Sequence, residues 1–264
     1  MMINDMTNSS LLINTDPRGV CTINLNRPEK HNAFNAEIIG ELLETLMKVD
    51  IDAGVRVVVI SGVGESFSSG ADLEWMRASD KFDEASNIHD AKQLSDLMRV
   101  LYELKKPIIA RINGSAFGGA LGLIACCDIA IACDTAEFAF SEVRLGLAPA
   151  VISPYILMSM GPRHARRLFL TAERFSAADA LAFDLVHKVC AADQLDQETD
   201  KQIAMLLKAG PQAINVCKAL VPRLTNDQID TELTVLIAKL RISAEGQEGL
   251  TAFFEKRKPD WVKD

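Results

Sequence analysis

Two glycine-rich segments of this 264-residue sequence could bring backbone N–H groups close to a ligand: residues 66–73 and residues 114–120. Glycine leaves the backbone uncovered by side chains, and the second segment opens an apolar stretch with the character of a helix. The free N–H groups at such a helix start carry partial positive charge. Two N–H groups that converge on one carbonyl oxygen would form an oxyanion hole, which stabilises negative charge developing there. The same glycines are also typical of tight strand-to-helix turns, so either segment alone leaves both interpretations open.

Several other kinds of site are excluded by motifs that the sequence lacks. It has no G-x-x-x-x-G-K-[ST] phosphate loop, no helix-opening G-x-G-x-x-G with a suitably placed acidic residue, and no G-x-S-x-G nucleophile elbow. The four histidines lack the spacing of metal ligands, and His31 is interpreted as a hydrogen-bonded turn residue. We interpret Asp72 as a helix cap, Asp128 as a side chain that bonds nearby backbone groups, and Cys126 and Cys127 as small core residues. We therefore expect no metal site.

The elements that would position the two segments alternate between strands and helices. Apolar runs predict strands at residues 57–60, 108–112 and 128–132, with helical patterns between them, up to Lys106 and after Gly119. This order contains two crossover units, which predict a parallel sheet covered by helices. Ligands of such sheets bind outside the carboxyl ends of the strands, where both glycine-rich segments lie.

The two ends of the sequence differ from this α/β centre. Residues 11–14 and 20–25 flank a Pro/Gly turn and predict a hairpin, and Asn35 predicts the N-cap of a helix over residues 36–50. Beyond residue 195 no strand is expected, and amphipathic patterns predict four helices, at residues 196–207, 211–220, 227–240 and 245–256. We therefore divide the chain into an α/β core, residues 1–195, and a helical region, residues 196–264.

The composition is that of an ordinary globular chain, with 48% hydrophobic and 24% charged residues. Lys and Arg number 28 against 36 Asp and Glu, and the net charge of −8 argues against a nucleic-acid partner and against adhesion to an anionic membrane. No apolar run approaches the roughly 20 residues of a membrane span, and the sequence does not begin with the pattern of a signal peptide. The six cysteines form no Cys-x-x-Cys pair. We expect a reduced, cytoplasmic protein.

Four motifs occur in a fixed order: NRPEKHNAF at 26–34, FSSGADL at 67–73, NGSAFGG at 113–119 and FSEVRLGLAP at 140–149. Together they resemble the crotonase superfamily of enoyl-CoA hydratases and isomerases, and the resemblance runs into the tail at residues 251–258. It implies an α/β fold built as a spiral of ββα units, with a C-terminal helical region that assembles a homotrimer or a hexamer of two trimers. It also implies an acyl-CoA substrate, with coenzyme A as part of that substrate and no further cofactor.

The resemblance also implies roles for individual residues. In this family a thioester carbonyl oxygen lies between two backbone N–H groups, whose matching positions are Ala71 and Gly119, and a glutamate that moves a proton matches Glu142. The implied contacts to coenzyme A match Ala33, Ser69, Ala71 and Leu73, and, from the tail of a neighbouring subunit, Phe253 on the adenine and Lys256 on the phosphates.

The sequence departs from the family at Gly122, where hydratases with two glutamates carry the first of them. A water clamp of two carboxylates therefore cannot be assembled, and Glu142 would act alone, first as base and then as acid. The space beside Gly122 would instead admit substrate bulk or water.

Residues 141–155 resemble the bacterial methylglutaconyl-CoA hydratases of leucine and isoprenoid breakdown. This favours a hydratase for a short branched or carboxylated enoyl-CoA, such as 3-methylglutaconyl-CoA, with Arg77 or Arg144 as the cation facing the distal carboxylate. Each arginine is also typical of a surface guanidinium paired with a carboxylate. The alternatives are a Δ3,Δ2-enoyl-CoA isomerase that uses the single Glu142, and a non-catalytic acyl-CoA-binding protein.

Overall fold

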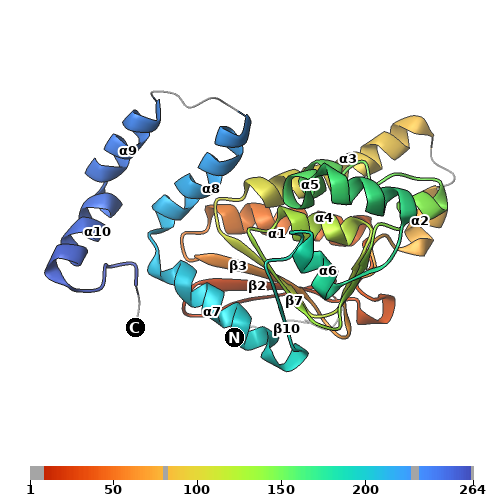
Figure 1. The fold of residues 1–264 in the computed structure, drawn as a ribbon, viewed down its shortest axis with the longest axis horizontal. Coiled ribbons are helices and arrows are strands. Elements are labelled where there is room, and N and C mark those ends of the chain that lie inside the picture. Colours follow the sequence, from red (N-terminus) through yellow and green to blue (C-terminus); the bar gives the residue numbers. More distant parts are fainter. Residues whose placement is uncertain (1–8, 80–82, 227–231, 263–264) are drawn as a thin grey trace.

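The computed structural model describes residues 9–79, 83–226 and 232–262. Within these ranges helices pack around strands (Figure 1), and the strands form one sheet of six strands and one of four. The larger sheet has the strand order β1-β2-β3-β5-β7-β10. Its strands are β1 (Leu11–Thr15), β2 (Val20–Leu25), β3 (Val57–Gly62), β5 (Ile108–Ile112), β7 (Ile129–Cys133) and β10 (Lys188–Cys190).

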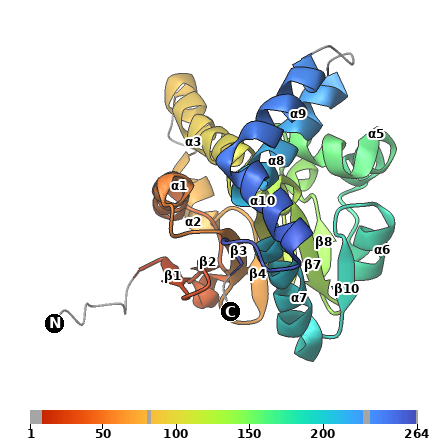
Figure 2. The same cartoon turned by 90° about the vertical axis from the view of Figure 1, so that its left-hand side faces the viewer.

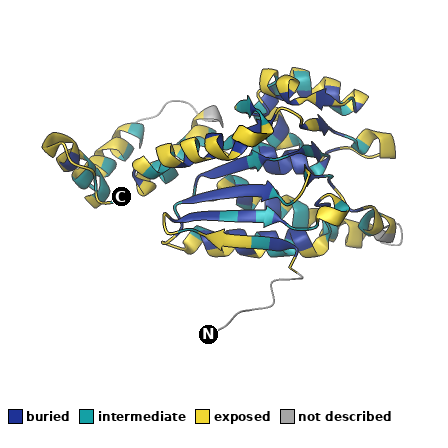
Figure 3. Ribbon diagram, turned by 90° about the horizontal axis from the view of Figure 1, so that it is seen from below, coloured by how far each residue is buried: buried dark blue, intermediate teal, exposed yellow. Residues whose placement is uncertain are grey.

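The pairing within the larger sheet confirms the predicted hairpin and the predicted parallel centre. β1 and β2 are antiparallel, and β2, β3, β5, β7 and β10 pair in parallel. Strands in the middle of this sheet are buried along most of their length, whereas β1 is largely exposed (Figure 3). Burial on both faces explains why β3 and β5 are nearly continuous apolar runs.

The smaller sheet was not predicted from the sequence. Its strands, in the order β4-β6-β8-β9, are β4 (Ser66–Ser68), β6 (Ser115–Phe117), β8 (Glu137–Ala139) and β9 (Phe175–Ser176). β6 lies inside the second glycine-rich segment, which the sequence predicted as a turn only. Strands of two or three residues are too short to display the alternation by which a strand is recognised.

The helices of the core complete a repeating strand–strand–helix order. They are α1 (Ala36–Ile51), α2 (Leu73–Ser79), α3 (Glu84–Glu103), α4 (Gly119–Cys126), α5 (Ser153–Thr171) and α6 (Ala177–Ala182). The units β3-β4-α2, β5-β6-α4 and β7-β8-α5 each place one strand in each sheet, so the chain winds as a spiral of ββα units. The predicted N-cap is confirmed, because the Asn35 side chain accepts a hydrogen bond from the Ile38 N–H. One apolar core joins strands of both sheets with α1, α3, α4 and α5.

The C-terminal part consists of α7 (Leu195–Lys208), α8 (Pro211–Asn226), α9 (Glu232–Ile242) and α10 (Ala244–Glu255). The predicted start of the third of these helices, at residue 227, lies outside the described residues. α7 packs against the larger sheet and buries Leu195 and Ile203. In contrast, α9 and α10 stand away from both sheets (Figure 1), on the side that faces the viewer in Figure 2. Within the described ranges, no helix combines the length and the apolar character needed to cross a membrane.

Candidate active site

Ala71, Gly119 and Glu142 follow three neighbouring parallel strands of the smaller sheet. β4 pairs in parallel with β6, and β6 pairs in parallel with β8. Each of the three residues comes two or three positions after the end of its strand. Because the carboxyl ends of parallel strands share one edge of a sheet, the three residues meet there. The strands that position them thus belong to the smaller sheet, not to the larger one that the sequence predicted.

The backbone at Gly70 brings the loop after β4 into contact with the loop after β6. Gly70 has a positive φ of 86°, and a Cβ on this residue would lie 2.6 Å from the Phe117 carbonyl oxygen. Only glycine permits so close an approach in this conformation. The loop that carries Ala71 therefore lies directly against the loop that leads to Gly119.

The amides of Ala71 and Gly119 are free to bind a ligand. Phe34 donates its N–H to the Gly70 carbonyl and accepts from the Asp72 N–H, so this pairing leaves the Ala71 N–H unused. Gly119 is the first residue of α4, where the N–H has no partner within the helix. Neither amide donates to any acceptor in the part of the chain that is described. Both residues line one cavity, so the pair can serve as an oxyanion hole.

This cavity has a volume of about 400 Å³ and is mainly apolar. Its wall includes the side chains of Phe34, Leu73, Trp75, Met76, Leu94 and Ile152. Among the described residues that line it, Glu142 carries the only ionisable side chain, and Ser69 and Ser141 carry the only hydroxyl groups. A site of this composition can hold an acyl chain and direct one carboxylate at it.

The Glu142 side chain enters the cavity from the short 3₁₀ helix Glu142–Leu145 that follows β8. Its Oε2 is buried and has no hydrogen-bond partner among the described residues. Burial raises the pKa of this carboxyl above its ordinary value, because desolvation penalises the charged form. A carboxyl group with a raised pKa and an unused oxygen is suited to accept and return a proton near neutral pH.

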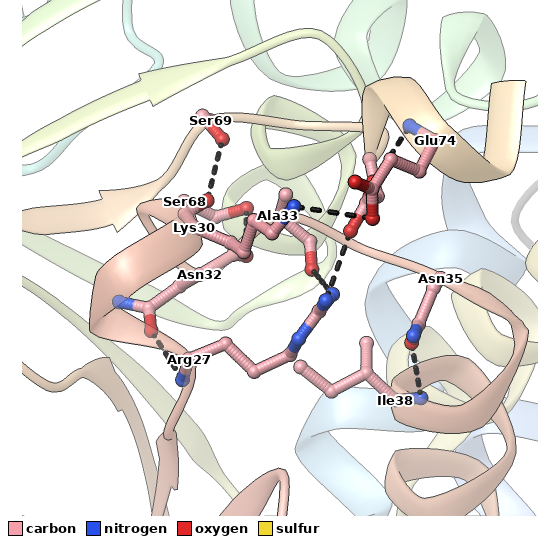
Figure 4. Close-up of polar contacts among 10 residues, drawn as sticks. Arg27, Lys30, Asn32, Ala33, Asn35, Ile38, Ser68, Ser69 and Glu74 are labelled. Atoms are coloured by element: carbon pink, nitrogen blue, oxygen red, sulfur yellow. Dashed lines mark hydrogen bonds and ion pairs between the residues drawn. The ribbon is translucent and has the colours of Figure 1, made fainter. Parts of the chain in front are cut away.

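Arg27 connects the loop that precedes α1 to the loop that carries Ala71 (Figure 4). The guanidinium donates to the Ala33 carbonyl at 2.9 Å and pairs with Asp72 Oδ2 at 2.9 Å. Asp72 Oδ1 also accepts from the Glu74 N–H at 2.8 Å, which confirms its predicted role as the cap of α2. The ion pair to Arg27 was not predicted, because residues 45 positions apart give no local signal.

The residues predicted to bind coenzyme A fall into three groups. Ser69 and Leu73 line the cavity, and Leu73 is largely exposed at the start of α2. Ala33 does not line it: the residue is buried and its carbonyl already accepts from Arg27. Phe253 and Lys256 lie at the end of α10, on the opposite side of the molecule from α2 (Figure 1). Within one chain, these two residues therefore cannot reach the cavity.

Comparison with known proteins shows to which family the chain belongs. Residues 15–264 match the family model of enoyl-CoA hydratase/isomerase. The chain belongs to the enoyl-CoA hydratase/isomerase family. The resemblance to the crotonase superfamily is thereby confirmed, and so is the expected spiral fold with its helical C-terminal region.

Some relatives of this chain are named hydratases and others are named isomerases. A crotonyl-CoA hydratase of Syntrophomonas wolfei is 31% identical over 247 residues, 90% of this chain and 92% of the relative. A trans-2-decenoyl-[acyl-carrier-protein] isomerase of Streptococcus mutans is 32% identical over 258 residues, 96% of this chain and 97% of the relative. The crystal structure of an enoyl-CoA hydratase from Shewanella pealeana has a TM-score of 0.92 at 44% identity and covers 96% of both chains.

Gly122, the position at which this family member departs from hydratases with two glutamates, does not line the cavity. A Cβ on Gly122 would lie 2.3 Å from Ile152 Cγ2, 2.8 Å from Ile152 Cβ and 3.1 Å from Met98 Sδ. Ile152 does line the cavity, and it covers Gly122. The expectation that Gly122 leaves room for substrate or water is therefore wrong, because Ile152 fills that room.

The contact between Gly122 and Ile152 leads to a prediction about stability. Gly122→Ala is expected to lower the free energy of unfolding by about 1–3 kcal/mol, because the added methyl group overpacks the core. In an Ile152→Gly background the same substitution is expected to be neutral or stabilising. Urea unfolding of the four proteins of this double-mutant cycle measures the coupling.

Gly40→Ala is the matched control for this cycle. Gly40 also lies inside a helix, α1, but a Cβ there would meet nothing within 4 Å. The substitution is expected to raise the free energy of unfolding by about 0.5–1 kcal/mol through helix propensity alone. A stabilising effect of Gly122→Ala in the wild-type background would contradict the contact with Ile152.

The two arginines considered for a distal substrate carboxylate do not line the cavity. Arg77 is exposed on α2. Arg144 donates to the Ala172 carbonyl at 2.9 Å, at the C-terminal end of α5. Cations stabilise helix C-termini, so Arg144 has a structural role that the sequence did not indicate.

The remaining polar residues take the structural roles that were predicted for them. His31 Nδ1 lies 3.1 Å from Ser66 Oγ in the turn before α1. Asp128 accepts from the Ile108 N–H at 2.8 Å and pairs with Lys218, and Cys126 and Cys127 are buried. Within the described ranges, no group of three or more His, Cys, Asp or Glu side chains could hold a metal ion.

Proposed function

We propose that the chain is an enoyl-CoA hydratase in which Glu142 is the single acid–base residue. The observation that carries this proposal is the position of the Glu142 carboxyl, buried in one cavity with the free amides of Ala71 and Gly119. Relatives named crotonyl-CoA hydratase and short-chain-enoyl-CoA hydratase support it.

The proposed reaction proceeds through an enolate. The thioester carbonyl oxygen accepts hydrogen bonds from the Ala71 and Gly119 N–H groups, which polarise the conjugated double bond. Glu142 takes a proton from water as the water oxygen forms a bond to C3. The electron pair of the C2=C3 double bond then forms the C1=C2 bond of the enolate, and the π pair of the carbonyl group moves onto the thioester oxygen. Glu142 then returns the proton to C2, so that water is added across the double bond and the carboxylate is regenerated.

We further propose that the acyl chain is uncharged. The described part of the cavity wall contains no lysine or arginine, and neither Arg77 nor Arg144 lines it. A buried carboxylate without a cation or hydrogen-bond donors is strongly disfavoured. The short branched substrate expected from the sequence fits an apolar wall, whereas a carboxylated substrate such as 3-methylglutaconyl-CoA gains no support from the described residues.

A second candidate is a Δ3,Δ2-enoyl-CoA isomerase, favoured by Ile152 in the place where two-glutamate hydratases hold their first carboxylate. Shifting a double bond needs one proton carrier and no water, and the isomerase relative supports this alternative. Incubation with crotonyl-CoA and separately with 3-hexenoyl-CoA distinguishes the two. We expect 3-hydroxyacyl-CoA from crotonyl-CoA, and double-bond migration without any hydroxylated product would contradict the hydratase.

The raised pKa of Glu142 predicts the pH dependence of hydration. Glu142 must be ionised to accept the proton of water, so kcat/KM is expected to fall as the pH drops through its pKa. Because burial raises that pKa, the fall occurs above the ordinary glutamate value of 4.5. The pH profile of kcat/KM measures it, and an apparent pKa at or below 4.5 would contradict a desolvated Glu142.

The helical region is proposed to assemble a homotrimer, or a hexamer of two trimers, in which Phe253 and Lys256 contact the coenzyme A of a neighbour. Large apolar side chains at its surface support this assembly: Val235, Ile237, Ile242, Leu250, Phe253 and Phe254. Apolar side chains exposed in such number are typical of protein interfaces. Light scattering in solution tests the assembly, and a monomeric mass would contradict it.

A further inference from the structure

A hydratase with one glutamate needs another group to hold the attacking water, and the structure offers one beside Gly118. The position that a Cβ would occupy on Gly118 lies 3.2 Å from Glu142 Oε1 and 3.9 Å from Ser141 Oγ. Both oxygens therefore face the same bare stretch of backbone. Gly118, Ser141 and Glu142 all line the cavity, so the space between these two oxygens belongs to the site.

The hydroxyl group of Ser141 is not used by the fold. Ser141 is the N-cap residue of the 3₁₀ helix Glu142–Leu145, a position where serine usually accepts a hydrogen bond from the helix start. No such bond is formed, and Ser141 Oγ has no hydrogen-bond partner among the described residues. In contrast, the other hydroxyl of the wall, Ser69 Oγ, donates to the Lys30 carbonyl at 3.3 Å.

We propose that the Ser141 hydroxyl is the second group that holds the attacking water, in place of the carboxylate that Ile152 excludes. The inference rests on the proposed hydratase function. One water hydrogen is donated to Glu142 and becomes the proton that later reaches C2, while the other is donated to Ser141 Oγ and stays on the new C3 hydroxyl. With both hydrogens fixed, a lone pair of the water oxygen is directed at C3.

This assignment separates hydration from the proton transfers that need no water. Removal of an α-proton from a saturated acyl-CoA requires the oxyanion hole and Glu142 only. Ser141 is a positioning residue, so its loss is expected to lower the rate of hydration and to leave the rate of α-proton removal unchanged.

The test compares two rates in each variant. Hydration of crotonyl-CoA is followed by the loss of its conjugated-thioester absorbance, and exchange of the α-protons of butyryl-CoA in D2O is followed by NMR. Ser141→Ala is expected to lower kcat for hydration about tenfold, the effect of one hydrogen bond, without changing the exchange rate. Ser141→Thr keeps the hydroxyl and is expected to restore most of the hydration. Ser159→Ala, whose hydroxyl donates to the Ile156 carbonyl outside this cavity, is the matched control and is expected to match the wild type.

Three outcomes would overturn the inference. Hydration by Ser141→Ala at the wild-type rate would show that the hydroxyl does not hold the water. An equal loss of hydration and exchange would show that Ser141 only maintains the shape of the site. Exchange without any hydration in the wild type would refute the hydratase itself, and with it a water-holding role for Ser141.

Discussion

Replacing Glu142 with glutamine is expected to reduce kcat/KM for hydration of crotonyl-CoA by about 10²–10⁴-fold, the usual contribution of a general acid–base group. The amide has nearly the shape of the carboxylate but cannot accept a proton from water. No other ionisable side chain is present in the described part of the cavity wall to replace it. The loss is expected in kcat, because in the proposed mechanism the oxyanion amides and the apolar wall bind the substrate, whereas Glu142 moves the proton.

The same substitution is expected to stabilise the fold at neutral pH. Burial raises the pKa of Glu142, so the folded protein binds this proton more tightly than the unfolded chain does. The stability that the protonated group contributes is therefore present at low pH and is lost as the pH rises through the raised pKa. Glutamine remains neutral at every pH. Urea unfolding is therefore expected to give Glu142→Gln a higher free energy of unfolding than the wild type at neutral pH, and this difference is expected to shrink at acidic pH.

Glu137→Gln is the control for both effects. Glu137 precedes the site on β8, but its carboxylate is exposed and paired with Arg174 at 2.8 Å. This variant is expected to keep wild-type kcat/KM. Wild-type turnover in Glu142→Gln would remove Glu142 from the mechanism and would favour a different base. An absence of turnover on any enoyl-CoA in the wild type would instead favour an acyl-CoA-binding role.

The sequence predicted the centre of the larger sheet because β3, β5 and β7 are long enough to show a pattern, but it missed β10, which has three residues. β3 and β5 are nearly continuous apolar runs that are buried on both faces, and the crossover rule then orders them in parallel. β4, β6 and β8 have only three residues each, so no periodicity could reveal the sheet that actually positions Ala71, Gly119 and Glu142.

The candidate site could be predicted from motifs, but the contacts that shape it could not. Gly122 indicated that a carboxylate is missing, whereas Ile152, 30 positions later, fills the vacant space. Likewise, Arg144 looked available to a substrate and proved to bind the end of α5. Both corrections depend on residues that approach each other only through the fold, which a single sequence does not record.

Replacing Gly70 with alanine is expected to reduce kcat/KM by about 10²–10³-fold, as the loss of one oxyanion donor does. The new methyl group would lie 2.6 Å from the Phe117 carbonyl oxygen, and a backbone atom cannot move aside as a flexible side chain can. The loop that carries the Ala71 N–H must therefore shift away from the loop of Gly119. The positive φ of 86° adds strain, so the free energy of unfolding is expected to fall by at least about 1–2 kcal/mol.

Gly161→Ala separates the strain of a positive φ from the clash. Gly161 has a φ of 72° within α5, but a Cβ there would meet nothing within 4 Å, and the residue does not line the cavity. This variant is expected to lose stability through backbone strain alone and to keep wild-type kcat/KM per folded molecule. If Gly70→Ala loses no more stability than Gly161→Ala and hydrates crotonyl-CoA normally, the contact with Phe117 does not position the Ala71 amide. If Gly70→Ala instead loses more activity than its fraction of unfolded protein explains, the contact between Gly70 and the Phe117 carbonyl positions the Ala71 amide.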